Sequence, residues 1–131
     1  MDREKLLDLY KKYELEKTDV YKHQHYVIIT RQGIEKIAAK ENITINYEVV
    51  KCEPNFAVVK AYAHFIDKPD ILIETFGSAL KGANYKDGNC NSWYVMEMAE
   101  KRALSRSVLK LTGFYELGVF GEDESDDFKR K

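Results

Sequence analysis

The chain has 131 residues, a length typical of one domain, and 44% of them are apolar, which is enough to form a core. Charged residues make up 33%, but the net charge is only −1, so overall charge directs the protein neither to nucleic acid nor to a membrane. The two cysteines and three histidines lack the spacing of a disulfide framework or a metal site, and there is no signal peptide or long apolar span. We therefore expect a cytoplasmic protein without metal or cofactor.

The N-terminal third predicts two helices separated by a short strand. Residues 2–17 carry an apolar stripe at helical spacing, formed by Leu6, Leu9, Tyr10 and Tyr13. Residues 25–29 (HYVII) are apolar and β-branched, so we expect an extended segment there. Thr30 is a suitable N-cap for a second helix, and Asn42 is a suitable end for it.

Three strands are predicted over residues 43–51, 56–66 and 71–80. The first alternates apolar and polar residues, which is the pattern of a half-buried strand. Short turns at 53–55 and 67–70 join the three segments. Because connections this short require antiparallel neighbours, the sequence predicts an antiparallel meander.

A polar loop over residues 81–92 precedes a long helix. Asn91 or Ser92 can cap its start, the helix runs to about Thr112, and Gly113 is a natural C-terminal cap. The element order predicts an α+β fold, in which an antiparallel three-stranded β-meander is followed by a long helix (a β-β-β-α core), with N-terminal helices.

The last segment of the chain is acidic. After Phe120 it carries five acidic and three basic side chains, net −2, which leaves +1 for residues 1–120. This charge pattern is typical of a disordered tail. We therefore predict one α+β domain over 1–120 and a flexible charged tail over 121–131, where Phe128 offers a contact for a protein partner.

The long helix has apolar residues on more than half of its circumference and a row of cations between them. Arg102, Arg106 and Lys110 are spaced i, i+4, i+8 and so share one narrow stripe. The apolar surface indicates two partners, the sheet of the same chain and a neighbouring subunit. A row of this kind indicates either a solvated face or a track of cations for phosphates.

The second strand supports the phosphate interpretation. Lys60, Tyr62 and His64 share one face, and a cation, an aromatic ring and an imidazole suit bases and phosphates, although Tyr and Lys are common on any half-exposed sheet face. The polar loop adds further lysines. The candidate nucleic-acid-binding residues are therefore Arg102, Arg106, Lys110, Lys60, Tyr62, Lys81 and Lys86.

The strand FAVVKAYAHFI, the turn DKPD, the strand ILIETFGSAL, the glycine loop and the helix AEKRALSRSVLKLTG together resemble the single-strand annealing recombination proteins. These include the eukaryotic radiation-repair mediator of strand annealing and Sak-type phage proteins. The resemblance covers residues 43–120 and implies a ring- or filament-forming homo-oligomer, of phage or mobile-element origin, that binds single-stranded DNA in a basic groove during recombination and repair. With the helix ends aligned at Gly113, Arg106 and Lys110 fall on the family's basic positions, whereas Arg102 rests on helix geometry alone.

Two other classes of function stay open. A small enzyme is one, but the sequence has no phosphate-binding glycine loop, no Ser-His-Asp order and no metal cluster, and scattered carboxylates such as Glu74, Glu97 and Glu100 are expected by chance. The other is a protein-interaction or assembly module of the same fold without annealing activity. The sequence favours a non-catalytic protein that binds single-stranded DNA.

Overall fold

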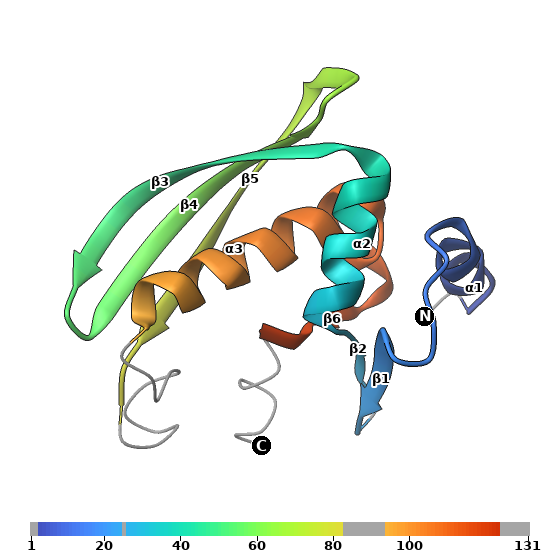
Figure 1. The fold of residues 1–131 in the computed structure, drawn as a ribbon, viewed down its shortest axis with the longest axis horizontal. Helices are drawn as coiled ribbons and strands as arrows, with labels where there is room; N and C mark the ends of the chain where they lie inside the picture. The colour runs from blue at the N-terminus through green and yellow to red at the C-terminus, as the bar shows by residue number, and fades with distance from the viewer. Residues whose placement is uncertain (1–2, 25, 83–93, 124–131) are drawn as a thin grey trace.

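The computed structural model describes residues 3–24, 26–82 and 94–123 and shows an α+β fold (Figure 1). The long helix α3 lies across one face of a three-stranded antiparallel sheet in the order β3-β4-β5, as predicted. The elements are α1 (Arg3–Lys12), β1 (Val20–His23), β2 (Tyr26–Ile29), α2 (Arg31–Glu41), β3 (Ile43–Glu53), β4 (Phe56–Phe65), β5 (Lys68–Leu80), α3 (Val95–Thr112), the 3-10 turn η1 (Tyr115–Leu117) and β6 (Val119–Gly121).

The meander differs from the prediction at its second turn. The predicted turn covered 67–70, but β5 already begins at Lys68 and pairs there with Phe65. The register then shifts before His64 pairs with Leu72. Pro69 is tolerated in this irregular start because β5 is an edge strand, where a missing N–H breaks no ladder bond.

Alternate residues of the meander form the layer beneath α3. In β4 the side chains that face the helix are small or β-branched and fully covered, namely Ala57, Val59, Ala61 and Ala63. In β5 the absent side chain of Gly77 lets the helix approach closely, since a Cβ there would lie 2.1 Å from the carbonyl oxygen of Ala99. The hydroxyls of Thr75 and Ser107 meet at 2.7 Å in the same buried interface.

The helix ends follow local rules, with one shortened helix. The Thr30 hydroxyl accepts a hydrogen bond from the N–H of Gly33, and Asn42 ends α2 in the left-handed region at φ 51°. Gly113 ends α3 at φ 89°. The first helix stops at Lys12 rather than 17, because Glu14 adopts a positive φ of 54° that a helix does not continue through. The two candidate N-caps of α3, Asn91 and Ser92, lie outside the described residues.

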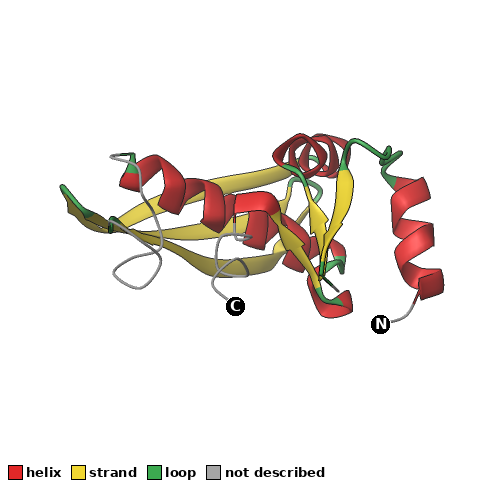
Figure 2. Cartoon of the chain, turned by 90° about the horizontal axis from the view of Figure 1, so that it is seen from below, coloured by secondary structure: helices red, strands yellow, loops and turns green. Residues whose placement is uncertain are grey.

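A second, smaller sheet in the order β1-β2-β6 was not predicted. β2 pairs antiparallel with β1 and parallel with β6, so residues 119–121 lie beside the N-terminal strand β2 (Figure 2). Gly118, at φ 78°, turns the chain from η1 into β6. The core beside this sheet consists of Tyr13, Val27, Ile29, Ile34, Ile37, Val108, Leu109, Phe114 and Val119, among others.

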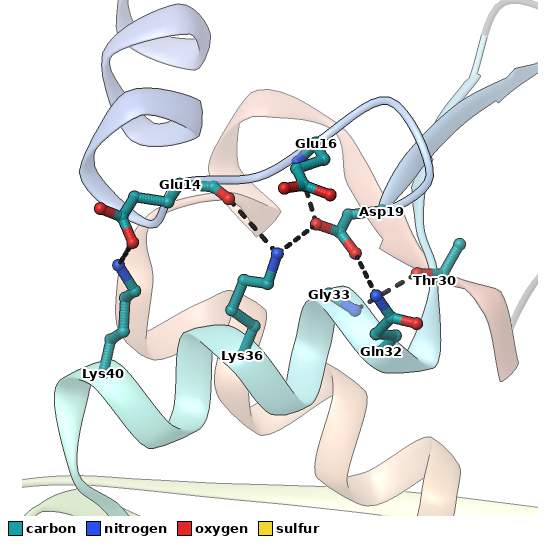
Figure 3. Close-up of polar contacts among 8 residues, drawn as sticks. All are labelled: Glu14, Glu16, Asp19, Thr30, Gln32, Gly33, Lys36 and Lys40. Atoms are coloured by element: carbon teal, nitrogen blue, oxygen red, sulfur yellow. Dashed lines mark hydrogen bonds and ion pairs between the residues drawn. The ribbon is translucent and has the colours of Figure 1, made fainter.

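One buried carboxylate connects the N-terminal loop to α2 (Figure 3). Asp19 is completely covered and accepts hydrogen bonds from the backbone N–H of Glu16 at 2.9 Å, the ammonium of Lys36 at 2.7 Å and the amide of Gln32 at 3.2 Å. Its backbone carbonyl accepts from the N–H of Thr30 at 2.8 Å. The loop is thereby held against the first turns of α2.

The fold continues into the predicted tail as far as Asp123. Gly121 belongs to β6, a Glu122 oxygen accepts from the Arg31 N–H at 3.2 Å, and the Asp123 carboxylate accepts from the Ser105 hydroxyl at 3.3 Å. The remainder, 124–131, lies outside the described residues. Within the part of the chain that is described, no helix is long and apolar enough to cross a membrane.

Candidate nucleic-acid interface

The cation row of α3 lies along the outer edge of β5. Arg102 donates to the carbonyl of Ser78 at 2.7 Å, and Arg106 donates to the carbonyl of Phe76 at 2.9 Å. The match is geometric, because four helical residues rise about 6 Å and two strand residues rise about 6.6 Å. Two of the three cations therefore hydrogen-bond the backbone of the sheet edge.

Arg102 is buried and hydrogen-bonds backbone carbonyls of the fold. Only 5% of the residue is exposed, and its Nε also donates to the carbonyl of Asp123 at 3.0 Å. Replacing these carbonyls with a phosphate would remove both supports of a buried guanidinium. The structure thus places this predicted phosphate ligand inside the fold, because Gly77 brings the helix closer to the strand than helix geometry alone indicates.

Arg106 and Lys110 extend the row toward solvent. Arg106 is half-buried, and Lys110 is exposed with its ammonium 5.3 Å from the centre of the Tyr115 ring. We call these two residues the basic rim.

Lys60 and Tyr62 lie on the sheet face opposite α3, which we call the open face. Its described side chains are all half-buried or exposed and include Phe56, Val58, Lys60, Tyr62, His64, Leu72, Glu74, Phe76, Ser78 and Leu80. Lys60 pairs with Glu74 at 2.8 Å, and the Tyr62 hydroxyl donates to Glu48 at 2.7 Å. The hydrogen bond to Glu74 raises the pKa of Lys60, and the hydrogen bond to Glu48 raises the pKa of Tyr62.

These carboxylates change the prediction for the open face. Glu48 and Glu74 flank Lys60 and Tyr62 through the strand register, and their charge disfavours phosphate directly above the sheet. The Lys60 ammonium stands 5.0 Å from the centre of the Tyr62 ring and 5.5 Å from the centre of the Phe76 ring, and Phe76 is among the exposed residues of this face. The open face therefore suits bases rather than phosphates.

Phe76 joins the two parts of the site and was missed from the sequence. Its backbone carbonyl accepts from Arg106 on the basic rim, while its ring lies on the open face, 48% exposed, directly opposite Lys60. Alternation along β5 places Phe76 on the same face as Glu74, but the pairing register was needed to set it beside Lys60. The sequence therefore indicated which face Phe76 lies on, but not that it lies beside Lys60.

Of the two loop lysines, the structure describes Lys81. Lys81 is half-buried just after β5, and its backbone N–H donates to the carbonyl of Asn55 at 2.7 Å. Lys86 lies outside the described residues. The contacts that connect candidate residues to one another run through Arg106, Phe76, Lys60 and Tyr62.

Two carboxylates bear on the enzyme alternative, Glu74 and Glu41. Glu74, one of the candidate carboxylates, is paired with Lys60. A cleft of about 310 Å³ contains Glu41, but the hydrogen bond from Tyr13 holds the pKa of that carboxyl below its usual value, the opposite of a general acid. In the ranges that the structure covers, no three metal-ligating side chains come together.

No protein-family model, curated protein or solved structure matches this chain. The basic rim and the open face are therefore the features from which a function can be inferred.

Proposed function

We propose that this protein binds single-stranded DNA and anneals complementary strands as a homo-oligomer, without catalysis, in recombination and repair. The observation that supports this is the connection of a cationic rim to an aromatic sheet face through one residue, Phe76. The resemblance of the sequence to annealing proteins suggests a phage or mobile-element source and a cytoplasmic site of action.

The mechanism requires only positioning. Phosphates bound by Arg106 and Lys110 would run beside β5, and the neighbouring bases would stack on Phe76 and Tyr62. Stacking tolerates any base, so the strand is held extended without sequence preference. A strand held in this way can test a second strand for complementarity, which is the physical requirement for annealing.

The first test is binding of a labelled oligo-dT by fluorescence anisotropy across a series of salt concentrations. Replacing Arg106 and Lys110 with Ala together removes two phosphate contacts, so the slope of log affinity against log salt falls by about 1.4. The control is the Arg3→Ala, Lys11→Ala pair, which removes two exposed cations from α1 and leaves the slope unchanged. Absence of binding at low salt overturns the proposal, and an unchanged slope in the rim variant moves the site elsewhere.

The second test concerns the open face. Phe76→Ala removes a stacking platform, which typically costs about 1–3 kcal/mol per base. Leu72→Ala is the matched control, because Leu72 is 51% exposed on the same face of the same strand but has no aromatic ring. Equal losses in the two variants would contradict base stacking. Annealing itself is measured from quenching between two labelled complementary strands.

An assembly module without annealing activity is the second candidate. The observation that favours it is the ion pairing on the open face, where Glu74 and Glu48 already engage Lys60 and Tyr62. This candidate predicts a defined oligomer by light scattering together with no response to oligo-dT.

A further inference from the structure

The two edges of the main sheet differ in how their backbone groups are satisfied. At the β5 edge, the carbonyls of Phe76 and Ser78 accept from Arg106 and Arg102, and the strand begins with an irregular segment containing Pro69. At the other edge, β3 pairs with no second strand among the described elements. An uncapped edge strand is a template for pairing with another strand.

The orientation of the β3 backbone follows from the hydrogen bonds of the other strands. In an antiparallel ladder, residues alternate between pointing their N–H and C=O groups toward one neighbour and toward the other. Phe76 and Ser78 point outward from β5, so Lys60 and Val58 opposite them point toward β3. The bond from the Ile66 N–H to the Asn42 carbonyl fits the same alternation.

Carrying the alternation across to β3 identifies its free groups. Glu48 pairs with Lys60 and Asn46 with Tyr62, so both point inward. The residues between and beside them, Ile45, Tyr47 and Val49, therefore present their N–H and C=O groups to the outer edge. Beyond Val49 the register shifts, and the regular edge ends there.

Two exposed apolar side chains of β3 lie on this same regular edge. Tyr47 is 39% exposed and Val49 is 58% exposed, and both point to the α3 side of the sheet, where they pair with Ala61 and Val59. Apolar side chains beside free backbone groups favour a strand as the occupant rather than nucleic acid.

A second copy of β3 is the occupant that fits. The β5 edge of another copy is already hydrogen-bonded by two arginines, and the strands of the small sheet have only four, four and three residues. We propose that two copies associate through β3 in antiparallel register centred on Tyr47, which forms one continuous six-stranded sheet.

The register is set by side-chain parity and charge. Centred on Tyr47, the pairing sets Tyr47 against the partner's Tyr47, Ile45 against the partner's Val49 and Glu48 against the partner's Asn46. The first two are hydrogen-bonded pairs by the alternation derived above, and the third is the non-hydrogen-bonded pair between them. Each pair joins side chains on the same face. Centring on Glu48 instead would set two carboxylates against each other, which is unfavourable.

Disulfide mapping tests both the contact and the register, in a chain with Cys52 and Cys90 replaced by Ser. Tyr47→Cys places two sulfurs on directly opposed residues, with Cα atoms about 5.5 Å apart, within disulfide reach. Val49→Cys is the matched control on the same edge and face, but its two copies are four residues out of register. We expect covalent dimer from the first variant only; equal cross-linking, or none in either variant, overturns the proposal.

Charge substitution provides a second test that does not alter the apolar edge. Asn46→Lys faces the partner's Glu48 at two symmetric places and tightens the dimer about fivefold, whereas Asn46→Asp weakens it by a similar factor. Sedimentation over two decades of protein concentration measures both, with circular dichroism confirming folding. A sedimenting monomer throughout, or equal effects of the two substitutions, overturns the β3 dimer.

The dimer proposal does not depend on DNA binding. The variants at Tyr47 and Asn46 leave the basic rim and Phe76 intact, and each is also titrated with oligo-dT. Loss of the dimer with oligo-dT binding retained separates failure of this inference from failure of the proposed function.

Discussion

The N-terminal layer, residues 3–41, and the meander with α3 are each stabilised by a different kind of contact. Where α3 meets β5, backbone approaches backbone, since Gly77 has no room for a Cβ between it and Ala99. In the N-terminal layer, charged side chains bridge loop and helix, and Asp19 receives Lys36 while Glu14 receives Lys40. The contact between α3 and β5 depends on Gly77 having no side chain. The N-terminal layer depends on hydrogen bonds to the buried carboxylate of Asp19.

The difference shows why a basic side chain cannot be assigned a role from its spacing alone. Arg102 and Arg106 are one helical turn apart, yet one is buried against the sheet edge and the other is half-buried on the rim. Lys36 and Lys40 on α2 have the same spacing, and only Lys36 reaches the buried Asp19. In both pairs the backbone beside the side chain decides between a structural contact and a surface contact.

The largest expected effect comes from adding a single methyl group at the helix–strand contact. In Gly77→Ala the new Cβ would meet the Ala99 carbonyl oxygen and the Ala103 nitrogen at 2.1 and 2.6 Å, so the helix must move. We expect a loss of roughly 3 kcal/mol in the free energy of unfolding, measured by urea denaturation. Ser78→Ala, at the exposed next position, should stay within about 0.5 kcal/mol. Equal stability of the two variants would contradict the close contact.

Removing the Asp19 carboxylate is expected to have the next largest effect. Asp19→Ala leaves the Glu16 N–H and the Gln32 amide without their acceptor in a covered site, at a cost of roughly 2–3 kcal/mol in unfolding free energy. The control is Glu16→Ala, which removes an exposed carboxylate from the same loop and keeps its backbone N–H. Thermal melts of the two variants that coincide would show that Asp19 is not a structural centre.

Arg102 and Arg106 should separate stability from binding. Arg102→Ala removes a buried group that donates to the Ser78 and Asp123 carbonyls, and we expect a loss of about 2 kcal/mol in unfolding free energy. Arg106→Ala should lose less than about 1 kcal/mol, because its contact to the Phe76 carbonyl is exposed. For oligo-dT affinity, corrected for the folded fraction, we expect Arg106→Ala to lose more than Arg102→Ala. The same order in both measurements would contradict the assignment of Arg106 to the rim.

Local patterns in the sequence predicted most of the fold. The cap at Thr30 and the glycine after α3 each depend on a few neighbouring residues, and both were confirmed. The strand predicted from alternation at residues 43–51 forms as β3, but its side chains do not alternate between buried and exposed, since all those from Asn46 to Glu53 are exposed. The pairing of β2 with β6 joins segments about ninety residues apart, and a three-residue strand such as VFG has no periodicity to detect. The site was predicted only in part for the same reason, because Phe76 acquires its place beside Lys60 through strand register.

The free energy of unfolding at acid pH provides a test of the N-terminal layer with a smaller expected effect. Burial alone would raise the pKa of Asp19, but hydrogen bonds from the Glu16 N–H and Lys36 outweigh it and hold the pKa below its ordinary value. A carboxyl with a depressed pKa in the folded state stabilises fully above its ordinary pKa of about 3.9 and loses that contribution as the pH falls further. The stability difference between the native chain and Asp19→Asn should therefore be constant near neutral pH and shrink below about pH 4. A difference that stays constant in acid would mean that the charge does not stabilise.

The smallest effect is expected at the ion pair between Glu14 and Lys40. The Glu14 side chain is 76% exposed, and although its hydrogen bond with Lys40 lowers the pKa of Glu14, water and salt screen such a pair. Glu14→Gln should leave the melting temperature unchanged at physiological salt and lower it slightly in dilute buffer.

Lys36→Met is the informative counterpart, because Lys36 lies one helical turn away on α2 and donates to the covered carboxylate of Asp19 as well as to the backbone carbonyl of Glu14. Its loss should lower the melting temperature at every salt concentration, since a covered partner is screened far less than an exposed one. If Glu14→Gln destabilised as much as Lys36→Met, the exposed pair would hold the loop to α2 as firmly as the buried carboxylate does, and the contrast between the two would fail.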